Sequence, residues 1–139
     1  MILLDTNVIS EPLKPGSDPA VLAWIDAQTV ETLFVSTITL AELRFGIAVM
    51  PEGKRKAGLR EQLEERVVPL FSGRILSFDA ECSMAYATIR SRARLGGKAI
   101  GAADGYIAAV AAVHGFMVAT RDTSPFEAAG CEVINPWEH

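Results

Sequence analysis

Residues 1–10, MILLDTNVIS, place an apolar run directly before a carboxylate. The run Ile2–Leu4 is typical of a buried strand, and Asp5, Thr6 and Asn7 follow it. All three are turn-forming residues, so Asp5 is compatible with a simple turn. It is also compatible with a binding site, because ligands of open α/β sheets bind beyond the carboxyl ends of the strands. The rest of the sequence has to decide between these two interpretations.

Short apolar runs alternate with longer amphipathic segments along the whole chain. The runs that we expect to be strands are Ile2–Leu4, Leu33–Ser36, Ile75–Phe78, Phe116–Thr120 and Cys131–Ile134. We expect helices from Pro19, over about 39–50, 59–68 and 80–95, and up to Gly115, with a break at PEGKRKAG (51–58). Such alternation is typical of parallel βαβ units, and 139 residues suit one domain. The sequence therefore predicts a single α/β domain over residues 1–139.

The composition excludes several classes of protein. Half of the residues are hydrophobic and 22% are charged, which excludes an intrinsically disordered chain. The net charge of −4 argues against a protein that coats nucleic acid through its overall charge. Cys82 and Cys131 lack CxxC spacing, so we expect reduced thiols. Polar residues interrupt the apolar stretch 102–119, and no cationic segment precedes a long apolar run. We therefore expect a cytoplasmic protein with neither a membrane span nor a signal peptide.

Three aspartates follow expected strands: Asp5, Asp79 and Asp122, the last with one residue between. Asp79 also directly precedes a helix, so a helix N-cap is the favoured interpretation there. For Asp5 and Asp122, a turn and a functional site both remain open.

Asp104 lies in the segment AIGAADGYIAAVAAVHG (99–115), on the helical face that it shares with Ile100 and Ile107. A carboxylate on an apolar helical stripe is costly unless a cation or a metal ion accompanies it. The two alternatives are a metal site and a salt bridge to Lys98 or to an arginine.

Glu42 lies in TITLAELRFG (37–46), where two interpretations are open. The spacing Thr39-x-x-Glu42 has the form of a capping box, which would make Glu42 structural. Together with Asp5, Asp104 and Asp122, however, it offers carboxylates from four separate elements. The chain has only two histidines, His114 and His139, and hard oxygen ligands suit Mg²⁺ or Mn²⁺ better than Zn²⁺.

These segments resemble the acidic motifs of the PIN-domain family, and more narrowly the VapC and FitB-like toxins. The resemblance spans the chain and rests on LLDTNVIS (3–10), STITLAELRFG (36–46), GAADGYIAAVAAVHG (101–115) and VATRDTSPFE (118–127). It implies a three-layer α/β/α fold around a central, mostly parallel sheet of four to five strands. It also implies an Mg²⁺-dependent endoribonuclease, in which Mn²⁺ can substitute, acting as the toxin of a toxin–antitoxin pair.

The resemblance also assigns roles to residues and partners. Asp5, Glu42, Asp104 and Asp122 carry over as the catalytic, metal-binding acids, and Asn7 and Thr120 as polar neighbours that orient them. Many relatives have Asn in place of Asp122 and Asp three positions later, where this chain has Pro125. The implied partners are an RNA substrate, a cognate antitoxin and a second copy of the chain, with operator DNA bound only through the antitoxin.

Four carboxylates repel RNA, so basic residues are needed nearby. Arg90, Arg94 and Lys98 lead along the chain toward Asp104 and are candidate RNA-binding residues. The run Lys54-Arg55-Lys56 is better interpreted as a solvated helix face.

Two other functions stay open at this level. One is a PIN fold that acts in RNA processing, or as an inactive RNA-binding module. The other is a phosphotransfer or signalling module. The second is disfavoured, because aspartate-nucleophile phosphatases need a second aspartate where this chain has Asn7.

Overall fold

The structure is a computed structural model that describes residues 1–138; His139 lies outside the described residues. Five strands form one sheet in the order β3-β2-β1-β4-β5, and every neighbouring pair is parallel. The strands are β1 (Ile2–Leu4), β2 (Leu33–Ser36), β3 (Ile75–Leu76), β4 (Met117–Ala119) and β5 (Val133–Ile134). All five expected strands are therefore confirmed, although the last three are shorter than the sequence predicted.

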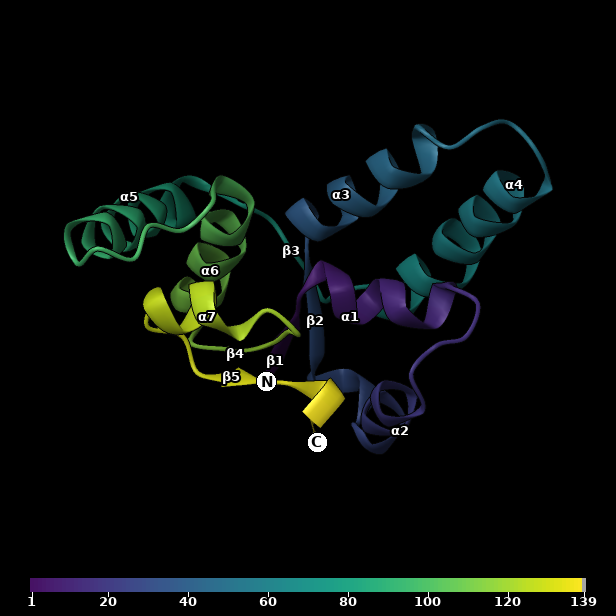
Figure 1. Cartoon of the computed structure of the whole chain (residues 1–139), viewed down its shortest axis with the longest axis horizontal. Coiled ribbons are helices and arrows are strands. Elements are labelled where there is room, and N and C mark those ends of the chain that lie inside the picture. Colours follow the sequence, from purple (N-terminus) through teal and green to yellow (C-terminus); the bar gives the residue numbers. More distant parts are fainter. Residues whose placement is uncertain (139) are drawn as a thin grey trace.

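Within the described residues, seven helices surround the sheet (Figure 1). They are α1 (Thr6–Ser10), α2 (Pro19–Ala27), α3 (Thr37–Ala48), α4 (Lys54–Glu61), α5 (Ala80–Leu95), α6 (Ala102–His114) and α7 (Thr123–Ala128). Shorter helical turns are η1 (Glu11–Leu13), η2 (Val30–Thr32), η3 (Gln62–Val67), η4 (Val68–Phe71) and η5 (Pro136–Glu138). Within residues 1–138, none of these helices combines the length and the apolar character that crossing a membrane requires.

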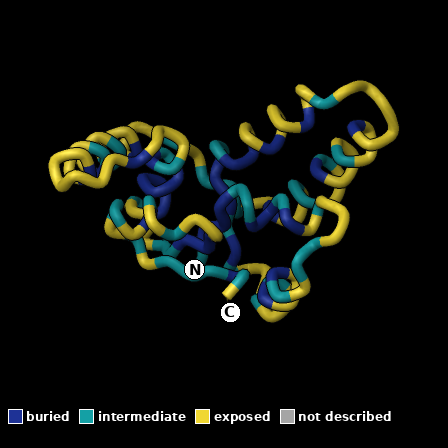
Figure 2. Tube along the Cα trace, viewed as in Figure 1, coloured by how far each residue is buried: buried dark blue, intermediate teal, exposed yellow. Residues whose placement is uncertain are grey.

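Adjacent residues of the central strand belong to two different cores. Leu3 packs with α5, α6 and α7, whereas Leu4 packs with α1, α2 and α3. Successive strand residues point to opposite faces, so both faces of the sheet are covered by helices. Figure 2 shows the buried chain running through the middle, with exposed helix surfaces outside. The expected three-layer α/β/α fold is confirmed.

Three predicted helix boundaries were correct because the capping residues act locally. Asp79 Oδ1 accepts a hydrogen bond from the Cys82 N–H at 3.0 Å, which confirms it as the N-cap of α5. Asp18 caps α2 in the same way, and Gly115 ends α6 with a positive φ of 70°.

Other boundaries differ from the prediction. The helices α1 and α7, of 5 and 6 residues, are too short to show a helical period in the sequence. Helix α4 begins inside the segment 51–58 that we expected to break the pattern. There Lys56 is buried, and its ammonium donates to the Ala48 carbonyl at 3.1 Å and to Glu52 at 2.6 Å. A tertiary contact thus stabilises a segment that lacks an apolar stripe.

The strand order places one crevice at the centre of the sheet. From β1 the chain continues to β2 and β3 on one side, and it returns to β4 and β5 on the other. The order therefore reverses between β1 and β4, and ligands of such sheets bind beyond the carboxyl ends at this point. Asp5 follows β1 and Thr120 follows β4, so both lie at the crevice.

Candidate active site

Asp5 lies at the junction of β1, β4 and α1. Its backbone N–H donates to the Ala119 carbonyl at 2.9 Å, which continues the β1–β4 pairing. One carboxylate oxygen, Oδ1, accepts from the Thr6 N–H at 2.8 Å and caps α1; the other, Oδ2, accepts from the Thr120 hydroxyl at 2.8 Å. The side chain is 5% exposed. Asp5 thus begins a helix rather than a turn, and it is buried at the crevice as well.

Burial raises the pKa of the Asp5 carboxyl to about 6. The hydrogen bonds from Thr120 and Thr6 lower this pKa, and the charges of Asp104 and Glu42 raise it further. Two acids from distant parts of the chain therefore lie within electrostatic range of Asp5.

Thr120 connects Asp5 to the other strand-end residues. Besides donating to Asp5, its Oγ1 accepts from the Asp122 N–H at 3.0 Å and from the Asn7 amide at 3.4 Å. Asn7 Oδ1 in turn accepts from the Arg121 N–H at 3.3 Å. The structure thus places Asn7 and Thr120 beside Asp5, where the sequence predicted the orienting residues.

Glu42 is an exposed residue of α3 that reaches back to α1. Its Oε1 accepts a hydrogen bond from the Thr6 hydroxyl at 2.6 Å. The capping-box interpretation of Glu42 is wrong, because α3 begins earlier: Ser36 is the N-cap, and its hydroxyl accepts from the Thr39 N–H at 3.1 Å. Sequence reasoning gave Thr6 no role at Glu42, because no local signal links residues 36 positions apart.

Asp104 lies in the first turn of α6. The sequence had placed it in the helix interior instead. A negative charge at a helix N-terminus is favoured by the helix dipole. Even so, the pKa of Asp104 is raised, first by burial and then by the charges of Asp122 and Glu42. Among residues 1–138 no basic side chain lies within 4.0 Å of its carboxylate, so the salt bridge to Lys98 or an arginine is not formed.

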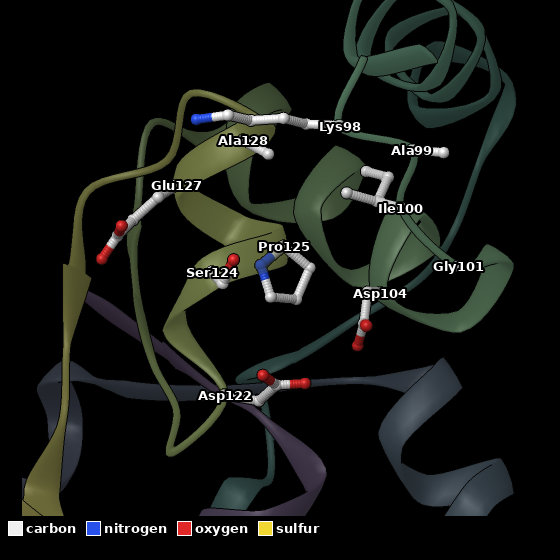
Figure 3. A pocket seen from close by; sticks show the side chains of 10 residues that line it. All are labelled: Lys98, Ala99, Ile100, Gly101, Asp104, Asp122, Ser124, Pro125, Glu127 and Ala128. Carbon is white, nitrogen blue, oxygen red and sulfur yellow. The ribbon is translucent and has the colours of Figure 1, made fainter.

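Asp104 and Asp122 share a cleft of about 630 Å³. Figure 3 shows their carboxylates turned toward each other, with Lys98 extended along α7 and Glu127 turned away. Asp122 occupies the N-cap position of α7, yet its side chain makes no capping hydrogen bond. Pro125 lines the same cleft, so no acid stands at the position where many relatives have one.

The four acids have the right chemistry to bind a divalent cation, although their side chains do not form a complete coordination site. Within residues 1–138, no three His, Cys, Asp or Glu side chains are close enough together to hold one ion. The acids nevertheless interact electrostatically. The charges of Asp104 and Glu42 raise the pKa of Asp5, and the charges of Asp122 and Glu42 raise the pKa of Asp104. Their donors are all oxygens, the ligands that Mg²⁺ and Mn²⁺ prefer. His114 is exposed at the far end of α6.

The basic residues predicted to bind RNA fall into different environments. Arg90 donates to the Ile100 carbonyl at 3.2 Å and to the Tyr86 hydroxyl at 2.8 Å, so its donors serve the packing of α5. These contacts do not favour a role in RNA binding, which stays a prediction. Arg94 is exposed in the last turn of α5, and Lys98 lines the cleft with Asp104.

The interpretation of Lys54-Arg55-Lys56 as a solvated helix face is confirmed for Lys54 and Arg55 and wrong for Lys56. The three residues form the first turn of α4, where Lys54 and Arg55 are exposed and Lys56 is buried in its contact with Glu52.

Comparisons with known proteins agree with the geometry. The family model described as the PIN domain matches residues 2–130. VapC ribonuclease Y4jK of Sinorhizobium fredii is 62% identical over 99% of this chain and 99% of that protein. Toxin FitB of Neisseria gonorrhoeae is 56% identical, again over 99% of each chain. The solved structure of FitAB bound to an IR36 DNA fragment matches with a TM-score of 0.96 and 54% identity, covering 99% of this chain and 96% of that one.

Proposed function

This chain belongs to the PIN-domain family, and we propose that it is a metal-dependent endoribonuclease and the toxin of a VapBC-type toxin–antitoxin pair. The observation that carries the proposal is the acid group at the β1–β4 crevice. Its carboxylates come from four elements, and their charges help to raise the pKa of Asp5 and of Asp104. Among residues 1–138 they have no cationic partner within 4.0 Å. Mutually repelling carboxylates are costly unless a cation binds them, which favours a metal site.

Each residue of the site has a distinct task in this proposal. Bound Mg²⁺ or Mn²⁺ supplies Lewis-acid stabilisation of the charge that grows on the scissile phosphate. Thr120 fixes the orientation of the Asp5 carboxylate, and Thr6 fixes that of Glu42. Asp104 and Asp122, which make no side-chain hydrogen bond among residues 1–138, are free to turn toward a cation. We expect 5′-phosphate and 3′-hydroxyl ends, because attack by water leaves the 2′-hydroxyl of the RNA unused.

Chelation and reconstitution test the nuclease. We expect the purified chain to cleave RNA with Mg²⁺ or Mn²⁺ and to stop in EDTA. Asp104→Asn should lower the rate on the order of a hundred-fold or more, because it removes charge from the metal site. Asp79→Asn is the matched control: it also removes one carboxylate, but Asn caps helices about as well as Asp. Cleavage undiminished by exhaustive chelation, or a dead Asp79→Asn enzyme, would contradict the assignment.

The toxin role rests on the relatives rather than on the site geometry. FitB is named a toxin, and a structure of FitAB bound to a DNA fragment has been solved. We therefore propose a cytoplasmic homodimer that a cognate antitoxin inhibits, with operator DNA bound only through the antitoxin.

Expression in bacteria tests this role. Expression of the chain alone should arrest growth, and co-expression of the protein encoded just upstream should relieve the arrest through a stable complex. Normal growth with abundant folded and RNA-cleaving protein would favour an RNA-processing nuclease instead.

A further inference from the structure

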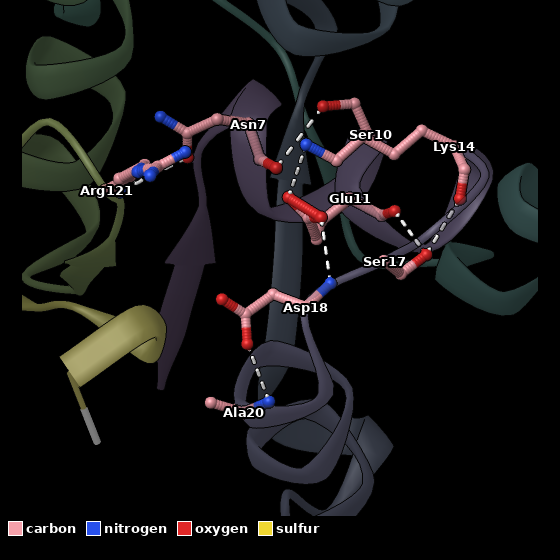
Figure 4. Close-up of polar contacts among 8 residues, drawn as sticks. All are labelled: Asn7, Ser10, Glu11, Lys14, Ser17, Asp18, Ala20 and Arg121. Carbon is pink, nitrogen blue, oxygen red and sulfur yellow. Dashed lines mark hydrogen bonds and ion pairs between the residues drawn. The ribbon is translucent and has the colours of Figure 1, made fainter.

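Arg121 stands between Thr120 and Asp122, and the proposed chemistry gives its side chain no task. The residue is exposed, and its backbone N–H donates to Asn7 Oδ1, a contact drawn in Figure 4. Its guanidinium carbon lies 5.3 Å from the centre of the Trp137 ring in η5. Among residues 1–138, its side chain makes no hydrogen bond and no ion pair within 4.0 Å.

Four other basic side chains are engaged in hydrogen bonds or ion pairs within the fold. Arg44 pairs with Glu64 at 2.6 Å, Arg74 donates to three backbone carbonyls, and Arg90 donates to Ile100 and Tyr86. Lys14 pairs with Glu11 at 2.9 Å. These cations stabilise the fold, whereas the Arg121 side chain contacts the Trp137 ring and lies within electrostatic range of the Glu11 carboxylate.

An arginine stacked on an aromatic ring keeps its donors available. Stacking uses the flat face of the guanidinium, while its N–H groups point outward from the edge in a planar fork. Such a fork matches the oxygens of a phosphate, which it can bind with two parallel hydrogen bonds. The stack also limits the conformations of the side chain before a ligand arrives. The arrangement is therefore suited to a phosphate group.

Arg121 and Lys98 have different neighbours beside the acids. Lys98 lines the cleft that contains Asp104 and Asp122, on the side of α6 and α7. Arg121 contacts Asn7 of α1 and Trp137 of η5, neither of which lines that cleft. The two residues therefore offer separate positive charges near the carboxylates, one in the cleft and one outside its lining.

We propose that Arg121, held by Trp137, binds a backbone phosphate of single-stranded RNA beside the scissile one, and that Lys98 engages the strand at the cleft of Asp104 and Asp122. This makes Arg121 a positioning residue, and the inference rests on the proposed function. In the competing explanation, the contact between Arg121 and Trp137 only stabilises the packing of η5 against residues 120–122.

Salt-dependent RNA binding separates the two explanations. The probe is a short fluorescein-labelled single-stranded RNA, titrated with Asp104→Asn protein in Mg²⁺ so that the RNA stays intact. In this background Arg121→Gln should weaken binding about 3- to 10-fold at low salt, and it should reduce the slope of log K against log salt by about 0.7, the value for one phosphate contact to a single strand. Arg92→Gln, which removes an exposed arginine of α5, is the control and should leave the slope unchanged. Trp137→Leu keeps the charge, so it should weaken binding without changing the slope.

Thermal melts of the same variants guard against a folding artefact. The inference is wrong if Arg121→Gln and Trp137→Leu lose stability while the salt slope of Arg121→Gln equals that of Arg92→Gln. The contact between Arg121 and Trp137 would then only stabilise the fold. If Arg121→Gln is too unstable to titrate, Arg121→Lys keeps the charge without the fork. It should then retain the full slope with weaker binding, and binding equal to the parent protein would overturn the inference. Cleavage is assayed separately, so a reduced slope in a protein that cleaves no RNA would reject the proposed nuclease but not the phosphate contact.

Discussion

Thr120 uses the full hydrogen-bonding capacity of its hydroxyl. A hydroxyl offers one donor and two acceptor positions, and here it donates to Asp5 and accepts from the Asp122 N–H and from Asn7. The residue is 0% exposed, so water does not compete for these bonds. A single side chain thus sets the orientation of Asp5 and the position of the loop that carries Asp122.

Replacing this hydroxyl should impair both activity and stability. Thr120→Val has nearly the same shape but leaves the Asp122 N–H and the Asn7 amide without their partner. We expect a rate loss of about 10- to 100-fold and a loss of about 1–3 kcal/mol in the free energy of unfolding. RNA cleavage rates and urea unfolding measure the two effects. Thr120→Ser keeps the hydroxyl and serves as the control; equal rates for Val and Ser would show that the network does not matter.

The raised pKa of Asp5 predicts how stability depends on pH. The folded protein binds this proton more tightly than the unfolded chain, because the pKa is about 6 against a model value of 3.8. The stabilisation is therefore fully present below about pH 4 and is lost as the pH rises through about 6. A shift of this size corresponds to a loss on the order of 2–3 kcal/mol between pH 4 and pH 7 in metal-free buffer.

Urea unfolding of the wild type and of Asp5→Asn across this pH range measures that contribution. The stability difference between the two proteins should move in favour of Asp5→Asn as the pH rises. A difference that stays constant from pH 4 to pH 7.5 would contradict the raised pKa.

At the scale of elements, Gly105 allows α5 and α6 to pack closely. A Cβ at this position would lie 3.0 Å from Arg90 Cδ and 3.0 Å from Tyr86 Cε2. Neither neighbour is free to move. The Tyr86 ring stacks on Tyr106 with 4.6 Å between ring centres, and Arg90 is bonded to the Ile100 carbonyl. Because Ile100 lies just before α6 and Asp104 lies in its first turn, this packing also positions one acid of the site.

Gly105→Ala should therefore destabilise the protein, although alanine is the better helix former. Overpacking predicts a loss of about 1–3 kcal/mol in the free energy of unfolding. Gly58→Ala is the matched control, since Gly58 lies within α4 and a Cβ there meets nothing within 4 Å. The control should gain up to about 1 kcal/mol from helix propensity. Chemical denaturation compares the two, and a stabilised Gly105→Ala protein would show that α5 and α6 have room to adjust.

At the scale of the whole molecule, the fold brings together four acids whose negative charges do not stabilise it. Asp5, Glu42, Asp104 and Asp122 come from four elements that meet at the point where the strand order reverses. Burial and mutual repulsion raise the pKa of Asp5 and of Asp104, which means that their ionised forms oppose folding. If the proposed metal site is correct, function and stability conflict at these positions.

Thermal melts with and without Mn²⁺ test this conflict. In EDTA, Asp104→Asn should melt slightly above the wild type at pH 7.5, because it removes one of the repelling charges. Saturating Mn²⁺ should stabilise the wild type by about 2.7 kcal/mol at a free concentration one hundred times the dissociation constant. It should stabilise Asp104→Asn much less. A destabilised Asp104→Asn protein that responds to Mn²⁺ as the wild type does would refute the metal site at this residue.

Several features of this protein are determined by the sequence alone. The five strand positions, the cap at Asp79 and the end of α6 at Gly115 were predicted correctly, because each depends on a few consecutive residues. The order of the acidic segments was enough to identify the family, which the comparisons then confirmed. The resemblance to that family also marked Asn7 and Thr120, although their contact joins residues 113 positions apart.

Other features are decided only by the tertiary structure. The sequence could not show that Thr6 bonds Glu42, or that Arg90 is engaged in packing while Arg121 rests on Trp137 with its donors free. It also placed Asp104 in a helix interior, because the start of α6 at Ala102 leaves no capping side chain to recognise. The reason is the same in each case. A side chain takes its pKa and its partners from neighbours in space, and here those neighbours are brought together by the parallel sheet rather than by the chain order.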